Sequence, residues 1–171
     1  MLQLSGTMLN RDVLSLRTGS TIAQIVAPII NPDNLKIEGF YCDEYESSTR
    51  TVLLYQDIRD VLPQGVVVND FDALSDPSEL VRLKKTLELD FDIMGKPVET
   101  VSRDKVGKVS DYAFESATMY IQKIYVSQSI LKSLTGGSLS VDRNQIQEIT
   151  PKRIIINDLL EPARVPVGAT A

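Results

Sequence analysis

The sequence predicts a mainly β protein: two tandem, small antiparallel β-barrels with one linker helix and one short helix. Two observations predict this fold. A motif at residues 57–70 recurs at 145–158, with a shared order of apolar, two polar, apolar, spacer, Pro, two polar, three β-branched residues and Asn-Asp. Both copies also alternate apolar and polar residues at a period of two, which is typical of strands. A repeat this long indicates domain-sized units rather than a solenoid.

The first unit is assigned to residues 1–75. Residues 22–27 alternate between two faces and predict a strand. Residues 31–34, Asn-Pro-Asp-Asn, predict a turn, because proline presets φ and Asn and Asp side chains bond the nearby backbone. We therefore expect a hairpin, whose second strand ends in a polar loop within residues 41–50. Several short strands at this spacing indicate a sheet curled into a small barrel.

Residues 76–92 are predicted to join the units through a helix. Asp76 is a suitable N-cap, Pro77 suits the first helical turn, and Glu79 would complete a capping box. Three leucines, Leu80, Leu83 and Leu87, form an apolar stripe at helical spacing. Residues 87–93 alternate strictly, so we expect the helix to give way there to a strand that opens the second unit.

The second unit is assigned to residues 93–160. Its early blocks, 106–109 and 119–124, follow their counterparts by 84 residues and its final motif by 88, so it holds four extra residues. A short helix over 127–134 is predicted, because Ser127 can cap its start and Gly136-Gly137 can end it. The tail, residues 161–171, contains two prolines and is expected to be extended or disordered.

Composition narrows the function classes. The chain has no His and one Cys, Cys42, which excludes an imidazole proton shuttle and an internal disulfide. The net charge is −5, and residues 1–75 alone carry −5. An acidic first half argues against wrapping nucleic acid, which needs a clustered positive field. No signal peptide and no membrane-spanning apolar run is visible, so we expect a soluble, cytoplasmic protein.

The chain resembles the PRC-barrel family, in a two-copy arrangement. The resemblance rests on 94–98 (Met-Gly-Lys-Pro-Val), 105–111 (Lys-Val-Gly-Lys-Val-Ser-Asp), 146–149 and 154–156. The first copy departs from the pattern, with Ala23 in place of Gly107 and residues 10–13 in place of 95–98. The resemblance implies the barrel fold. Family functions in ribosome maturation and in the photosynthetic reaction centre do not transfer directly, because the glycine-rich signature of the accompanying N-terminal barrel and the membrane helix are absent from this sequence.

Candidate chemical sites have structural alternatives. The densest carboxylates could bind a hard cation or form a solvated hairpin tip; they are Asp43, Glu44, Glu46, Asp57 and Asp60. The glycines Gly65, Gly136 and Gly137 match no phosphate-loop pattern. Cys42 has acidic neighbours and no His to activate it. Asn69-Asp70 and Asn157-Asp158 lie at equivalent strand ends. They either share a function or end the strands with turn-forming side chains. We therefore predict no catalytic, cofactor-binding or metal-binding residue.

The remaining hypothesis concerns partners. Residues 66–68 and 154–156 are apolar on both faces, whereas a lone barrel needs one apolar face, so Val67 and Ile155 should be covered by the sister barrel, the linker or a second subunit. Leu80, Leu83 and Leu87 form a second possible docking face, unless they pack on their own barrels. We predict a non-enzymatic protein-binding adaptor or scaffold, with homodimerisation possible.

The alternative is an accessory factor in ribosome maturation or RNA handling. It would require basic residues of the second unit to converge on one surface; they are Lys105, Lys108, Lys123, Lys132, Arg143, Lys152 and Arg153.

Overall fold

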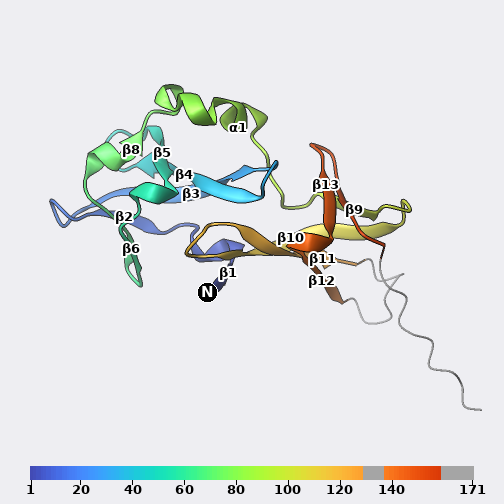
Figure 1. Cartoon of the computed structure of the whole chain (residues 1–171). Helices are drawn as coiled ribbons and strands as arrows, with labels where there is room; N and C mark the ends of the chain where they lie inside the picture. The colour runs from blue at the N-terminus through green and yellow to red at the C-terminus, as the bar shows by residue number, and fades with distance from the viewer. Residues whose placement is uncertain (129–136, 159–171) are drawn as a thin grey trace, which may run out of the picture.

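The computed structural model describes residues 1–128 and 137–158 and is mainly β, with two mixed sheets and one α-helix in that part of the chain (Figure 1). The first sheet has the order β6-β7-β2-β3-β4-β5-β8. Its strands are β2 (Asp12–Ser15), β3 (Thr21–Asn31), β4 (Lys36–Glu44), β5 (Arg50–Leu54), β6 (Asp60–Leu62), β7 (Gly65–Val68) and β8 (Leu74–Ser75).

The second sheet has the order β12-β11-β10-β9-β14-β13, with β1 also paired to β10. Its strands are β1 (Leu2–Leu4), β9 (Pro97–Thr100), β10 (Lys105–Glu115), β11 (Ile121–Ser127), β12 (Ser138–Asp142), β13 (Ile146–Ile149) and β14 (Ile154–Ile156). Short 3₁₀ turns precede β6 and β13 at equivalent places, η2 (Tyr55–Asp57) and η6 (Arg143–Gln145).

The two sheets repeat one topology. Six strands follow the same order in each, and each sheet is antiparallel except for one parallel pair, β2 with β7 and β9 with β14. The expected hairpin turn is confirmed, because β3 and β4 are antiparallel and the Asn31 and Asn34 side chains accept the Asp33 and Lys36 amides. The strand order of each sheet has two ends, so within the described residues neither sheet closes into a barrel.

The sheets meet at equivalent residues. Lys36 and Tyr120 form an isolated antiparallel bridge. The Ile37 amide donates to Met119 O, and the Ile121 amide donates to Leu35 O, both at 2.8 Å. At the 84-residue offset of the repeat, Leu35 corresponds to Met119 and Ile37 to Ile121, so each isoleucine bonds the counterpart of the residue two positions before it. The contact therefore has the form of a two-fold interface, with the same surface used twice, inside one chain.

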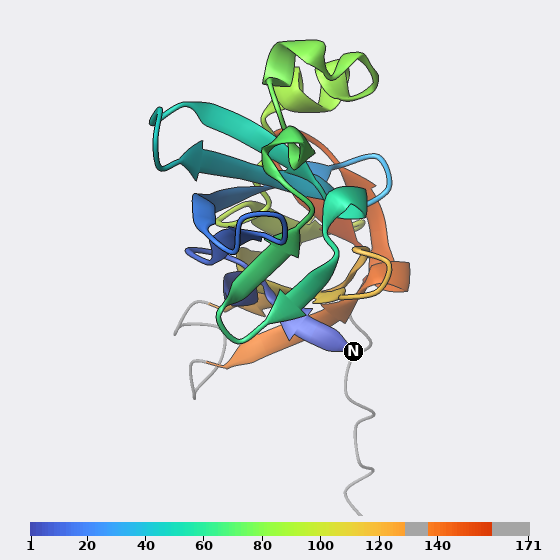
Figure 2. The ribbon, with the colours of Figure 1, turned by 90° about the vertical axis from the view of Figure 1, so that its left-hand side faces the viewer.

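The segments that lead into each unit are exchanged between the sheets. β1 precedes the first sheet but pairs with β10 of the second, where Leu4 lies opposite Ala113. The linker helix α1 (Lys84–Leu89) precedes the second sheet but contacts β3 of the first. Figure 1 shows β1 beneath the first half and α1 above it; Figure 2 shows the linker standing over the first sheet from another side.

One hydrophobic core runs through both units. Its buried members include Ile25, Phe40, Phe114 and Ile124, drawn from long strands of both sheets. Leu35 and Met119 continue the core through the junction. Both residues have positive φ, 54° and 61°, which is uncommon for residues other than glycine, and they occupy equivalent positions. The units therefore share their core instead of each enclosing one.

The structure corrects one predicted element and leaves two other segments outside the described residues. Residues 87–93 were expected to form a strand, which is wrong: Leu87–Leu89 end α1, Asp90 has a left-handed φ of 42° that ends the helix, and β9 begins at Pro97. The helix expected over 127–134 and the tail, 161–171, lie essentially outside the described residues; Ser127 itself ends β11. Among the residues the structure describes, no helix has the length and hydrophobicity needed to cross a bilayer.

Candidate docking groove

The linker forms three short turns of helix over the first sheet. Asp76 caps the first turn, η4 (Pro77–Glu79), because its carboxylate accepts the Ser78 amide at 2.8 Å. A second 3₁₀ turn, η5 (Val81–Leu83), leads into α1. The expected N-cap is therefore confirmed, but the α-helix starts eight residues after Asp76, at Lys84. Glu79 forms no side-chain capping bond among the described residues.

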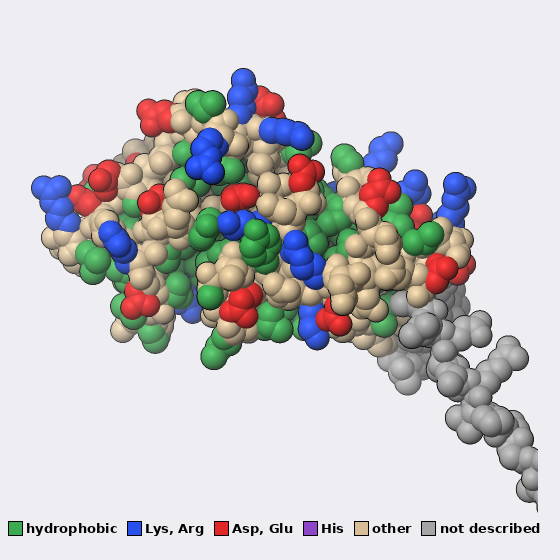
Figure 3. Space-filling view, viewed as in Figure 1, with side chains coloured by type: hydrophobic (Ala, Val, Ile, Leu, Met, Phe, Trp, Pro, Cys, Tyr) green, Lys and Arg blue, Asp and Glu red, His purple; other side chains and the backbone are tan. Residues whose placement is uncertain are grey.

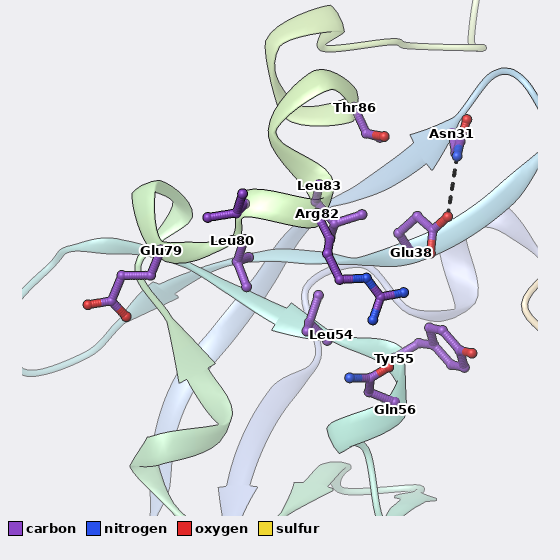
Figure 4. A pocket seen from close by; sticks show the side chains of 11 residues that line it. Asn31, Glu38, Leu54, Tyr55, Gln56, Glu79, Leu80, Arg82, Leu83 and Thr86 are labelled. Carbon is purple, nitrogen blue, oxygen red and sulfur yellow. Dashed lines mark hydrogen bonds between the residues drawn. The ribbon is translucent and has the colours of Figure 1, made fainter.

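A groove of about 470 Å³ lies between this linker and the first sheet (Figure 4). Leu54 of β5 forms its floor, and Leu80 and Leu83 form an apolar wall. Polar groups at the groove are supplied by Tyr55, Gln56, Asn31 and Thr86. The sheet surface facing the linker is apolar, because Leu54 continues a cross-strand row with Gly39 and Ile29.

Gly39 keeps this surface flat. A Cβ at this position would lie 2.4 Å from Leu53 O, so a side chain is excluded by the neighbouring strand. Ile29 and Val52 are buried yet do not belong to the main core. They lie on β3 and β5, the strands that α1 and β8 contact. A small second apolar layer therefore lies under the linker, and the groove is the part of it that stays open.

Three charged side chains line the groove and differ in their partners. Arg82 points into it, toward Leu54 and Tyr55, and its guanidinium forms no hydrogen bond or ion pair within the described residues (Figure 4). Glu38 accepts a long hydrogen bond from Asn31 at 3.4 Å, and its charge helps to raise the pKa of Lys36. Glu79 points away from the groove. Arg82 is thus the charge without a partner that faces the groove.

The rim adds exposed apolar surface. Val81 is 80% exposed, the highest value after Met1 among the large hydrophobic residues that the structure describes. Lys84 and Lys85 follow it, and each lies 3.9 Å from an acidic partner, Glu88 and Asp33. Figure 3 shows basic side chains gathered over the linker, with acidic ones between them. Val81 and Arg82 therefore place exposed apolar surface and an unpaired cation side by side at this rim.

The five residues expected to face a partner are not brought together. Leu80 and Leu83 line the groove, and Leu87 is half-buried on α1. Val67 lies on β7 and is 6% exposed, outside the main core. Ile155 lies on β14 and is half-buried. Arg82 and Val81 were missed from sequence, because a charge and a single valine give no periodic signal beside the leucine stripe.

Two of the candidate carboxylates, Asp43 and Glu44, have side-chain partners that hold them in place. Asp43 forms an ion pair with Arg50 at 2.8 Å, and Glu44 accepts from Ser47 at 2.6 Å. In the described part of the chain, no three His, Cys, Asp or Glu residues gather as metal ligands would. Burial raises the pKa of the Cys42 thiol to about 12. A thiol in that state is a poor nucleophile at neutral pH.

Comparison with known proteins adds no assignment: no protein-family model matches the chain, and no curated protein matches its sequence.

Proposed function

We propose that this chain is a non-enzymatic protein-binding adaptor whose docking site is the groove between the linker and the first sheet. The proposal rests on three neighbouring features of the groove. Leu54, Leu80 and Leu83 give it an apolar lining. Val81 is exposed at its rim, and Arg82 faces it without a partner among the described residues. Apolar surface with a few convergent polar groups is the general composition of ligand and peptide sites.

The residue inventory supports binding over catalysis. The sequence contains no His, and the buried thiol of Cys42 has a raised pKa. The aspartates whose pKa is lowered are held by hydrogen bonds to neighbours, as Asp70 is by the Phe71 amide and by Arg17 and Ser15. None of these groups is a base or nucleophile with a pKa tuned toward neutrality.

The RNA-handling alternative has less support. Of the basic residues of the second unit, Lys123 lies 3.3 Å from Asp142, and Arg153 lies 3.0 Å from Glu99. Arg143 donates to the carbonyls of Ile121 and Asn34. Cations neutralised by carboxylates or committed to backbone carbonyls leave fewer charges for phosphate.

Three further proposals rest on the sequence alone: kinship with PRC-barrel proteins, a cytoplasmic location and self-association. The hypothesis of self-association allowed for a second subunit that covers Val67. The chain itself already buries Val67 to 6% exposure. Ile155 is half-buried and keeps some surface for a second copy.

A matched pair of substitutions tests the docking site. A phage-displayed library of short random peptides is selected on the full chain, and selected peptides are titrated by fluorescence anisotropy. Val81→Asp should weaken their binding at least about tenfold, because it places a charge at the apolar rim. Val101→Asp is the control, since Val101 is 58% exposed on the loop after β9 of the other sheet. Equal effects of the two variants would contradict the proposal.

A further inference from the structure

We infer that the groove takes a peptide segment in which an aspartate or glutamate lies beside an apolar residue, and that Arg82 selects the carboxylate. This inference rests on the proposed function, because it names the partner chemistry of the same groove.

The groove is lined by one cation and two carboxylates. Its three lining charges are Arg82, Glu38 and Glu79. Glu38 has Asn31 as a hydrogen-bond donor and lies near Lys36, whereas Glu79 is turned away (Figure 4). The guanidinium of Arg82 faces the groove without an acceptor among the described residues. A bound carboxylate would give this guanidinium the hydrogen-bond acceptor that it lacks.

The shape of the Arg82 guanidinium suits a carboxylate. Guanidinium presents a planar fork of N–H donors that matches a carboxylate with two parallel hydrogen bonds. The linker presents two further cations, Lys84 and Lys85, whose ion pairs with Glu88 and Asp33 are long and exposed. Each lysine is thus matched by one carboxylate, whereas Arg82 has no such partner among the described residues.

The groove also presents apolar surface to a bound group. Leu54, Leu80 and Leu83 line the groove next to Arg82, and Val81 lies at its rim. An isolated carboxylate would leave these surfaces in water. An acidic residue followed or preceded by an apolar one satisfies both requirements, and Gln56, Asn31 and Thr86 offer amide and hydroxyl groups to a peptide backbone.

The experiment is the peptide selection repeated on charge variants of the full chain. Wild type should enrich Asp or Glu next to Leu, Ile, Val or Phe. Arg82→Glu should enrich Lys or Arg at that peptide position instead, and Arg82→Gln should bind the acidic peptides about fivefold more weakly. Arg82 is exposed, so these variants are expected to keep the fold, which circular dichroism checks.

The outcomes separate the two proposals. An acidic consensus that Arg82→Glu converts to a basic one supports the inference. Peptides that lack an acidic preference but are lost on Val81→Asp overturn the inference and leave the proposed function in place. An acidic consensus that Arg82→Glu leaves unchanged also overturns the inference. Selection of no peptide that depends on Val81 overturns both.

Discussion

At the scale of single residues, the repeated Asn-Asp pair has a structural role in both units. Asp70 accepts from Ser15 and Arg17, which lie at and after the end of β2, and Asp158 accepts from the Ser102 amide and hydroxyl after β9. The Asn69 and Asn157 side chains accept from equivalent residues of the preceding hairpin, Arg59 and Gln147. Each Asn-Asp pair therefore links its preceding hairpin, β6–β7 or β13–β14, to the residues at the end of the parallel strand, β2 or β9. The repeat in the sequence identified the pair. It could not identify the residues that the pair contacts, because some of them lie on or after another strand of the sheet.

The lowered pKa values of these aspartates predict how the free energy of unfolding changes at acid pH. Hydrogen bonds from the Phe71 amide, Arg17 and Ser15 lower the pKa of Asp70, and those from Ser102 lower the pKa of Asp158. A lowered pKa in the folded state stabilises the fold above the unfolded value of about 3.9, and this stabilisation is lost as pH falls through the folded pKa. Asp70→Asn with Asp158→Asn should flatten the fall in unfolding free energy below about pH 5.

Urea denaturation across that pH range provides the measurement. Asp72→Asn is the control, because the Asp72 carboxylate forms no hydrogen bond or ion pair among the described residues. An unchanged slope in the double variant would contradict the assigned role.

The junction shows a residue exchange that sequence comparison alone could not interpret. In the first unit Lys36 lies 4.3 Å from the centre of the Tyr55 ring and donates to its hydroxyl. In the second unit the counterpart of Lys36 is Tyr120, and the counterpart of Tyr55 is Arg143, whose guanidinium carbon lies 5.0 Å from the Tyr120 ring. Cation and aromatic ring have changed places, so the contact is kept while residue identity is not.

At the scale of elements, strands were predicted better than the segments between them. Alternating patterns located β3, β4, β10 and β11, because period two with turn residues is a local signal. The alternation of 87–93 failed, because so short a run also fits the end of a helix followed by a left-handed residue, here Asp90. The sequence did not predict that β1 pairs with the second sheet and that α1 contacts the first, since the two segments are unlike in sequence.

The parallel pair β2–β7 makes a prediction at Gly65, which is part of the repeated motif. A Cβ on Gly65 would lie 2.4 Å from Asp12 O of the neighbouring strand. Gly65→Ala should therefore lower the unfolding free energy by about 1–3 kcal/mol, as overpacking does. Urea denaturation measures the change. Gly6→Ala is the matched control, since a Cβ there meets nothing within 4 Å. A Gly65→Ala protein as stable as Gly6→Ala would show that the strands separate at little cost.

At the scale of the whole molecule, duplication was visible in the sequence, but the shared core was not. The repeat predicts two equivalent units, and the common strand order agrees with it. Independence of the units does not follow, because Leu35, Ile37, Met119 and Ile121 join them through backbone hydrogen bonds and one core. Contacts between equivalent residues of two copies leave no periodic trace beyond the repeat itself.

The shared core predicts a single cooperative unfolding transition. Calorimetry should give a calorimetric enthalpy equal to the van't Hoff enthalpy, because neither unit can open without exposing the junction. Two resolved transitions, or an enthalpy ratio near two, would indicate independent units and contradict the shared core.

The docking groove follows from the same architecture, since the linker that forms its wall is the exchanged leader of the second unit. Hydrogen exchange of the full chain with and without a library-selected acidic peptide tests it most directly. We expect slower exchange in residues 31–38, 54–56 and 79–86, with β9 and β10 of the second sheet unchanged. Protection confined to the second sheet, or none in the groove segments at saturating peptide, would contradict the assignment of this groove as the binding site.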